Sequence, residues 1–158
     1  MYSTIYHSPI GPLWLTTDGT HLTGLWMKDP GSTIPDSSVP VLSDTCHWLD
    51  AYFRGEKTTP DSLPLSPAGT AFQRRIWDIL LQIPYGQTRT YGEIARELAY
   101  QLGKEKMSAQ AVGGAVGRNP ISIIIPCHRC MGVGGALTGY AWGIEKKAWL
   151  LRHEEEHL

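Results

Sequence analysis

Residues 121–129 read Ile-Ser-Ile-Ile-Ile-Pro-Cys-His-Arg, and the interpretation of the whole chain starts from this stretch. The β-branched run at residues 121–125 is typical of a buried strand, and Pro126 ends it because proline cannot continue a central strand. Cys127 would then stand at the end of that strand. A histidine and an arginine follow it, and neighbouring cations favour the thiolate form of cysteine. The stretch therefore predicts a buried strand that presents a reactive thiol.

Two short helices are predicted before this strand. Thr90 can cap the first, residues 91–98, and Glu93 stands at the capping-box spacing from it. After a polar turn, Ser108 can cap the second, residues 109–116. Two short helices joined by a polar turn indicate a helix-turn-helix.

The second of these helices carries the paired glycines Gly113 and Gly114. Each costs roughly 1 kcal/mol in a helix interior relative to alanine. Small residues are explained if another backbone, of protein or of nucleic acid, must approach closely. Tight packing inside the core explains them as well, and the glycines alone do not decide between the two.

The N-terminal part of the chain has the pattern of a small antiparallel sheet covered by one helix. Residues 1–28 alternate apolar and polar side chains around a turn at Asp18-Gly19. Residues 29–40 are rich in proline, glycine and serine and predict a loop, whereas residues 41–53 have apolar residues at helical spacing.

A domain boundary is expected near residue 70. Residues 55–69 contain three prolines and predict a linker, and a helical face begins after it at residues 72–80. We therefore expect an N-terminal domain with its linker at residues 1–70 and a second domain at residues 71–158. The fold class expected is α+β.

The C-terminal residues 144–156 predict an amphipathic helix with Ile144, Ala148 and Leu151 on one side. Residues 153–157 match the HExxH zinc motif literally. The match lies close to the end of the chain with no third ligand after it, so a frayed polar tail is the better interpretation.

Composition excludes several classes of protein. The chain has 158 residues, of which 42% are hydrophobic and 18% charged, as expected for one domain or two small ones. No apolar run approaches the ~20 residues of a membrane helix, and the N-terminus lacks the features of a signal peptide. We therefore expect a cytoplasmic protein. Three cysteines, an odd count, disfavour a disulfide framework and leave the thiols for chemistry.

Charge is distributed unevenly although the net charge is only −1. Residues 1–70 carry three basic and seven acidic side chains, whereas residues 71–153 carry eleven basic and five acidic ones. A basic second half fits a polyanionic partner such as nucleic acid. A chance fluctuation of surface charge explains the pattern about as well.

Four motifs in the second half are similar to those of the O6-alkylguanine-DNA alkyltransferases, a resemblance that covers about Phe72 to Glu154. They are Asn119-Pro120, Ile125-Pro126-Cys127-His128-Arg129, Leu137-Thr138-Gly139-Tyr140 and Lys147-Ala148-Trp149-Leu150-Leu151-Arg152-His153-Glu154. Residues 8–13 and 51–55 resemble the family more weakly.

The resemblance implies a ribonuclease H-like sheet with a helix, followed by a winged helix-turn-helix-like domain that enters the minor groove and flips out the damaged guanine. The implied function is DNA repair by irreversible, stoichiometric transfer of the O6-alkyl group to Cys127. The implied partner is double-stranded DNA containing O6-alkylguanine. No cofactor or metal is expected, and the protein would act as a monomer.

Site residues follow from the same resemblance. Cys127 would accept the alkyl group, and His128 would take its proton through a bridging water. Glu154 would orient that imidazole, Asn119 would brace the turn before the cysteine, and Tyr91 would donate to guanine N3.

The resemblance also implies contacts with the flipped base and with DNA. Base contacts would come from the carbonyls of Cys127 and Cys130, the amide of Ala141, and the side chains of Tyr140 and Trp142. DNA contacts would come from Ser108, Gln110, Ala111, Gly113, Gly114 and Arg118.

Three positions depart from the family pattern. Gln110 stands where an arginine finger usually fills the gap left by the flipped base, and the turn before it is extended. Cys130 stands where valine is common, and Trp142 where glycine often stands. We expect the indole of Trp142 to narrow the mouth of the pocket.

The same residues allow other interpretations. Cys127 and Cys130 form a CxxC pair, but a proline before the first cysteine, a preceding strand and the lack of a βαβ pattern argue against a thioredoxin-like site. Arg129 fits a structural ion pair or a phosphate contact better than a catalytic role. The alternative function is that of an alkyltransferase-like lesion-binding protein without efficient transfer, although such proteins typically lack the acceptor cysteine. A helix-turn-helix regulator is the third possibility.

Overall fold

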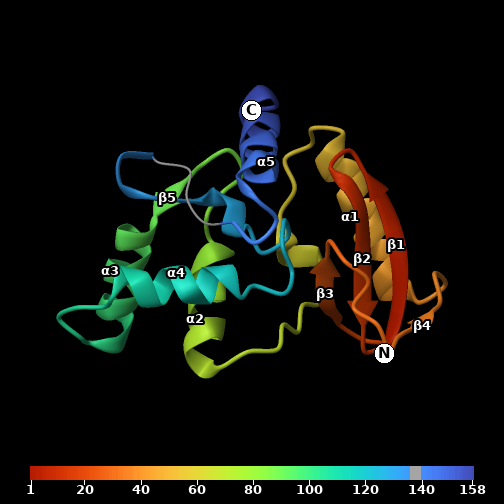
Figure 1. The fold of residues 1–158 in the computed structure, drawn as a ribbon, viewed down its shortest axis with the longest axis horizontal. Helices are drawn as coiled ribbons and strands as arrows, with labels where there is room; N and C mark the ends of the chain where they lie inside the picture. The colour runs from red at the N-terminus through yellow and green to blue at the C-terminus, as the bar shows by residue number, and fades with distance from the viewer. Residues whose placement is uncertain (136–139) are drawn as a thin grey trace.

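A β-sheet and a group of helices lie side by side in the computed structural model, which describes residues 1–135 and 140–158 (Figure 1). Strands β1 (Tyr2–Ser8), β2 (Gly11–Thr17) and β3 (Leu22–Trp26) form the predicted antiparallel sheet. The Asp18 carboxylate accepts backbone hydrogen bonds within the β2–β3 turn, and Gly19 there has a φ of 107°, which favours glycine.

A fourth strand, β4 (Ile34–Pro35), pairs in parallel with β1 and gives the sheet order β3-β2-β1-β4. The prediction of a loop throughout residues 29–40 is therefore wrong at these two residues. The pairing uses backbone groups, with the amide of Ile34 donating to the carbonyl of Met1. Backbone pairing of two residues leaves no side-chain pattern that a sequence could show.

Helix α1 (Pro40–Phe53) covers one face of the sheet, as expected. The leucines between the two layers are completely buried, among them Leu13, Leu15, Leu42 and Leu49. The following segment contains a 3-10 helix, Pro60–Ser62, and then runs beside β3, where the Leu22 amide donates to the Pro64 carbonyl over 2.7 Å. This segment thus packs against the sheet.

The helical part contains the predicted helix-turn-helix. This part of the chain begins with α2 (Ala71–Leu80) and β5 (Arg89–Thr90). The two helices of the predicted motif follow as α3 (Tyr91–Leu102) and α4 (Ala109–Gly117). Thr90 and Glu93 form the predicted capping box, and Ser108 caps α4 by accepting from the Ala111 amide. Side-chain caps of this kind satisfy amides that the first helical turn leaves without partners.

Residues 121–125 are buried as predicted, but they do not form a strand. Ile123 has a φ of 71°, and the Ile125 amide donates to the Ile121 carbonyl, so the segment is a series of turns. Its link to the sheet is an isolated bridge between Ile121 and Leu25. A short buried apolar run has the same composition in either conformation, which is why the prediction of a strand was wrong.

After these turns come a 3-10 helix (Cys127–Arg129), β6 (Cys130–Met131), a second 3-10 helix (Val133–Gly135) and α5 (Ile144–Glu156). Cys127 therefore begins a helical turn instead of ending a strand. Strand β6 pairs in parallel with β5. Residues 137–139 of the motif cited above lie outside the described part of the chain.

The buried side of α5 differs from the predicted one. Lys147, Leu150, His153 and Glu154 are buried, whereas Ile144 is 52% exposed. Charged residues line the buried side because their partners lie across the helix interface, and an apolar pattern cannot show this. The α+β class is confirmed, and within the described residues no helix is long and apolar enough to cross a membrane.

Candidate active site

Cys127 lies at the centre of the candidate site and is 4% exposed. Its Sγ is 3.8 Å from Oγ of Ser122 in the preceding turns. Burial raises the pKa of the Cys127 thiol, while Asn119, Ser122 and Lys147 act in the opposite direction. The expectation that the adjacent histidine and arginine favour the thiolate is wrong, because both side chains pair with a carboxylate instead.

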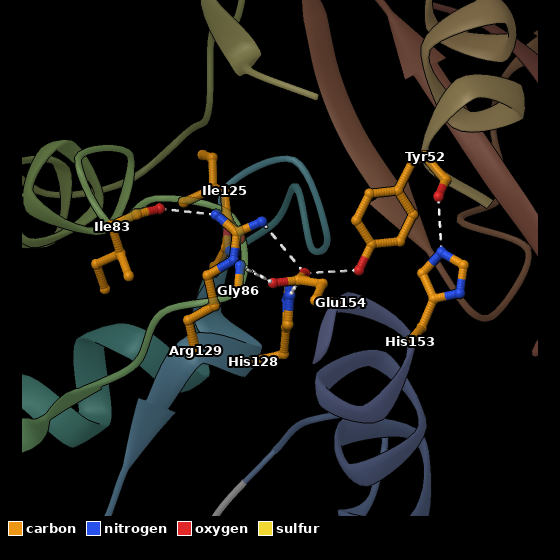
Figure 2. Close-up of polar contacts among 9 residues, drawn as sticks. Tyr52, Ile83, Gly86, Ile125, His128, Arg129, His153 and Glu154 are labelled. Carbon is orange, nitrogen blue, oxygen red and sulfur yellow. Dashed lines mark hydrogen bonds and ion pairs between the residues drawn. The ribbon is translucent and has the colours of Figure 1, made fainter. Parts of the chain in front are cut away.

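That carboxylate belongs to Glu154 on α5, as Figure 2 shows. Its Oε2 lies 2.5 Å from Nε2 of His128 and accepts from the Tyr52 hydroxyl at 2.7 Å. Its Oε1 accepts from Nε of Arg129 at 2.8 Å and from the amide of Gly86 at 3.1 Å. The carboxylate therefore joins α1, the loop after α2, the turn of the cysteine and α5.

The electrostatics of this network follow from its burial. Burial acts to raise the pKa of Glu154, but His128 and Arg129 outweigh it and hold that pKa well below its usual range. Burial lowers the pKa of His128, and Glu154 opposes that effect. With Nε2 of His128 facing the carboxylate, Nδ1 is left without a hydrogen-bond partner among the described residues. A neutral imidazole of that tautomer can accept a proton at Nδ1.

Two predictions about this region have clear outcomes. Arg129 makes the structural ion pair expected of it, and its Nη1 also donates to the carbonyl of Ile83 at 2.7 Å. The frayed tail expected at residues 153–157 is wrong for its first two residues. His153 is 7% and Glu154 1% exposed, and Nε2 of His153 lies 2.7 Å from the carbonyl of Tyr52.

Asn119 braces the turns before the cysteine, in the position expected of it. Its Nδ2 donates to the Ile125 carbonyl at 2.8 Å, and its Oδ1 accepts from the Ile121 amide at 2.9 Å. A single amide side chain thus closes the segment that contains Ile123 in its left-handed conformation. The backbone on the N-terminal side of Cys127 is held by these bonds.

Lys147 is a site residue that sequence reasoning missed. It is fully buried on α5, and its Nζ donates to the Cys130 carbonyl and lies 5.8 Å from the centre of the Tyr91 ring. Burial lowers the pKa of Lys147, and the thiols of Cys130 and Cys127 act to raise it. Its place seven residues before Glu154, on the same helix face, was the available signal.

Of the residues expected to line the base pocket, Tyr140 interacts with the Cys127 thiol and Trp142 packs against Tyr140. The Tyr140 hydroxyl is buried without a hydrogen-bond partner in the described ranges, and burial together with Cys127 raises its pKa. The Tyr140 ring meets the Trp142 ring edge to face, with centroids 5.9 Å apart. Ala141 between them is exposed. Tyr91 contributes a half-buried ring from the first turn of α3.

The residues expected to contact DNA lie together on α4 and its ends. Ser108, Gln110, Ala111, Gly114 and Arg118 are exposed. A Cβ added to Gly114 would meet no atom within 4 Å, and one on Gly113 would only touch the Tyr91 ring at 4.0 Å. Tight core packing therefore does not explain Gly114, which leaves the surface of α4 open at this position.

Comparison with known proteins gives a consistent result over both halves of the chain. Residues 1–67 match the family model described as 6-O-methylguanine DNA methyltransferase, ribonuclease-like domain, and residues 71–156 match the DNA binding domain of the same description. A methylated-DNA–protein-cysteine methyltransferase of Methanosarcina acetivorans is 45% identical over 98% of both chains. One of Mycobacterium tuberculosis is 48% identical, over 98% of this chain and 92% of its own.

A solved structure of the same family has a similar fold over nearly the whole chain. The crystal structure of Mycobacterium tuberculosis OGT in complex with DNA matches with a TM-score of 0.88 and 44% identity, over 99% of this chain and 94% of that one. The match therefore includes both the half that fits the ribonuclease-like domain and the half that fits the DNA binding domain.

Proposed function

The chain belongs to the methylated-DNA–protein-cysteine methyltransferase family, and we propose that Cys127 is the residue that takes the alkyl group from O6 of guanine in DNA. The observation that carries this assignment is a nearly buried thiol in the same short helix as a histidine bonded to a buried carboxylate. The protein's activity is DNA repair by alkyl transfer to cysteine.

In the proposed step, Sγ of Cys127 attacks the saturated carbon bound to O6. A sulfur–carbon bond forms, the carbon–oxygen bond breaks, and its electron pair goes to the guanine. The thiol proton passes to Nδ1 of His128, and a bridging water is needed because adjacent side chains rarely face each other. Glu154 holds the imidazole in the required tautomer and stabilises its positive charge once the proton arrives. A thioether sulfur is a poor leaving group, so one chain repairs one lesion.

The leaving guanine gains negative charge, which donors around it would stabilise. We assign this role to the Tyr91 hydroxyl, at guanine N3, and to the Ala141 amide, at O6. The carbonyls of Cys127 and Cys130 would accept from the exocyclic amine, and Lys147, which bonds the second of these carbonyls, fixes its direction. Tyr140 and Trp142 would pack against the base, and the narrowed mouth expected from Trp142 stays a prediction.

For DNA, the open face of α4 supports docking in the minor groove, with Gln110 filling the gap left by the flipped base. We propose O6-alkylguanine in duplex DNA as the lesion. The unit that carries α4 and Cys127 would be residues 71–158, with residues 1–70 as the second domain. We propose that the protein acts as a monomer, and a cytoplasmic location remains a prediction.

Intact-mass measurement after incubation with duplex DNA containing O6-methylguanine tests this function. We expect one methyl group on the protein, located at Cys127, and none on Cys127→Ala, which should still bind the DNA. Binding without any methyl adduct would favour the lesion-binding alternative. Continued repair beyond one equivalent per chain would contradict the single-turnover mechanism.

A further inference from the structure

Cys130 carries a thiol that the proposed alkyl transfer does not use. It is 0% exposed, and all three cysteines of the chain are free. The transfer step engages the backbone carbonyl of Cys130, whereas its side chain points into the protein interior. Because solvent does not reach this sulfur, an external reagent or a second protein cannot react with it directly in the folded state.

The turn that contains Cys127 brings the two cysteines close together. The Cys130 amide donates to the Cys127 carbonyl, closing a 3-10 turn. Such a turn keeps its end Cα atoms within about 7 Å of each other, and a disulfide requires roughly 4.4–6.8 Å. Cys130 ends this turn and begins β6 in an extended conformation, so the two cysteines stand at the two ends of a single turn.

Both sulfurs interact electrostatically with one cation, Lys147, whose Nζ also donates to the Cys130 carbonyl. The thiols of Cys130 and Cys127 both act on the ammonium group of Lys147, and Lys147 in turn acts to lower the pKa of each thiol. Burial raises the pKa of both thiols, and Lys147 is a cation that acts against this effect at both of them, beside Asn119 and Ser122 at Cys127 and Arg89 at Cys130. Two buried thiols are therefore within electrostatic range of one buried ammonium.

From this geometry we propose that Cys127 and Cys130 form an oxidation site in which Cys130 is the resolving cysteine. A peroxide oxidises the Cys127 thiolate to a sulfenic acid and is reduced to water or an alcohol. The Cys130 sulfur then attacks the sulfenic sulfur, a sulfur–sulfur bond forms, the sulfur–oxygen bond breaks, and water leaves with the Cys130 proton. A dithiol reductant reverses the bond and restores both thiols.

The consequence is reversible protection of the acceptor. While the disulfide exists, Cys127 cannot attack an alkyl carbon, but it also cannot proceed to the irreversible sulfinic acid. The disulfide itself does not depend on the proposed alkyl transfer, whereas its effect on repair rests on that function.

Trypsin offers a direct readout on the full chain, because it cuts after Arg129, between the two cysteines. Each cysteine falls in its own peptide: residues 29–54, 119–129 and 130–146. Reduced protein is treated with hydrogen peroxide, remaining thiols are blocked after denaturation, and the digest is analysed with and without reduction. We expect peptide 119–129 linked to peptide 130–146, and methyl transfer that is lost on oxidation and returns with dithiothreitol.

Two variants make the test decisive. Cys130→Val, which suits a buried strand position, should give no linked peptide, sulfinic acid at Cys127, and severalfold less transfer recovered by dithiothreitol. Cys130→Ser serves the same purpose if the valine variant does not fold by circular dichroism. Cys46→Ala, at a half-buried cysteine on α1 remote from these thiols in sequence, should behave like the parent.

Three results would overturn the proposal: sulfinic acid at Cys127 of the parent without linked peptides, links that involve Cys46, or equal recovery in the parent and the Cys130 variants. A linked pair of peptides in a protein that accepts no alkyl group would support the oxidation site while contradicting the proposed function.

Discussion

The surroundings of Glu154 and the outer face of α4 differ in burial and in the number of polar contacts. Glu154 is 1% exposed and, within the described part of the chain, has five hydrogen bonds, with Tyr52, Gly86, His128 and Arg129. Gly114 on α4 faces open space. The groups proposed for the chemistry are thus held in a buried network, whereas the surface proposed to recognise DNA is open at Gly114. Substitutions should therefore affect folding and chemistry together at Glu154, but affect them separately on α4.

Glu154→Gln should produce the largest effect. The amide keeps the size of the side chain but removes the charge, leaves Arg129 buried without its counterion, and turns one acceptor into a donor that faces other donors. Breaking a buried ion pair on one side costs about 3–5 kcal/mol. We expect that loss in the free energy of unfolding by urea, together with slow alkyl transfer. Glu155→Gln, an exposed neighbour on α5, is the control and should change neither quantity.

The pH dependence of stability tests the same network. His128 and Glu154 both have folded-state pKa values below their usual ones, so the unfolded chain binds more protons in each window. The free energy of unfolding should then decrease as the pH is lowered, first below about pH 6.5 because of His128 and further below about pH 4.3 because of Glu154. Urea unfolding over this range should show both steps in the parent. The second step should be smaller in Glu154→Gln but still present, because Asp18, Asp36 and Glu93 also have lowered pKa values. Stability that rises on acidification would contradict the assigned shifts.

Tyr52→Phe should have an intermediate effect. It removes one hydrogen bond to a buried carboxylate, which joins α1 to α5, and bonds to charged groups contribute about 1.5–3 kcal/mol. Tyr6→Phe is the matched control, because its hydroxyl bonds Asp50 at 2.6 Å at an exposed site. We expect a cost of about 0.5 kcal/mol or less there. Equal losses in the two variants, measured by urea unfolding, would show that burial does not set the strength of the Tyr52 bond.

Gly114→Ala should separate stability from recognition. A Cβ at this position meets no atom, so alanine should stabilise α4 by about 0.5–1 kcal/mol. The same methyl group would lie between α4 and DNA, so methyl transfer from duplex DNA should slow. Transfer from free O6-methylguanine is the control and should not change. Unchanged duplex transfer in a stabilised variant would remove Gly114 from the DNA interface.

Local signals in the sequence were sufficient for much of the fold. The capping box of Thr90 and Glu93 and the Ser108 cap were predictable because each involves residues three positions apart. The turns at residues 121–125 were not, because a buried apolar run has no signature of its own without knowledge of its partners. Tyr52 and Glu154 are separated by 102 positions, so their contact depends on how the two halves pack. The candidate thiol was predicted from the residues around it and the role of the imidazole from the family resemblance, whereas the contacts of Lys147 required the structure.

Gln110 should give the smallest effect on stability and a selective effect on function. It is exposed in the first turn of α4, so Gln110→Ala should leave the free energy of unfolding within about 0.5 kcal/mol of the parent. Flipping a base costs a few kcal/mol of unstacking and unpairing, and a side chain that fills the gap offsets part of that cost.

If Gln110 fills that gap, Gln110→Ala should slow transfer from duplex DNA much more than transfer from free O6-methylguanine. Gln110→Arg should keep or raise the duplex rate, because a guanidinium adds attraction to phosphates and a stacking plane. The competing source of this contact is the turn before α4, where Lys104 and Lys106 are exposed. Equal duplex rates for Gln110→Ala and the parent, with a clear loss in Lys104→Ala or Lys106→Ala, would move the contact to that turn. The open face of α4 would then recognise the groove while a neighbouring segment stabilises the flipped state.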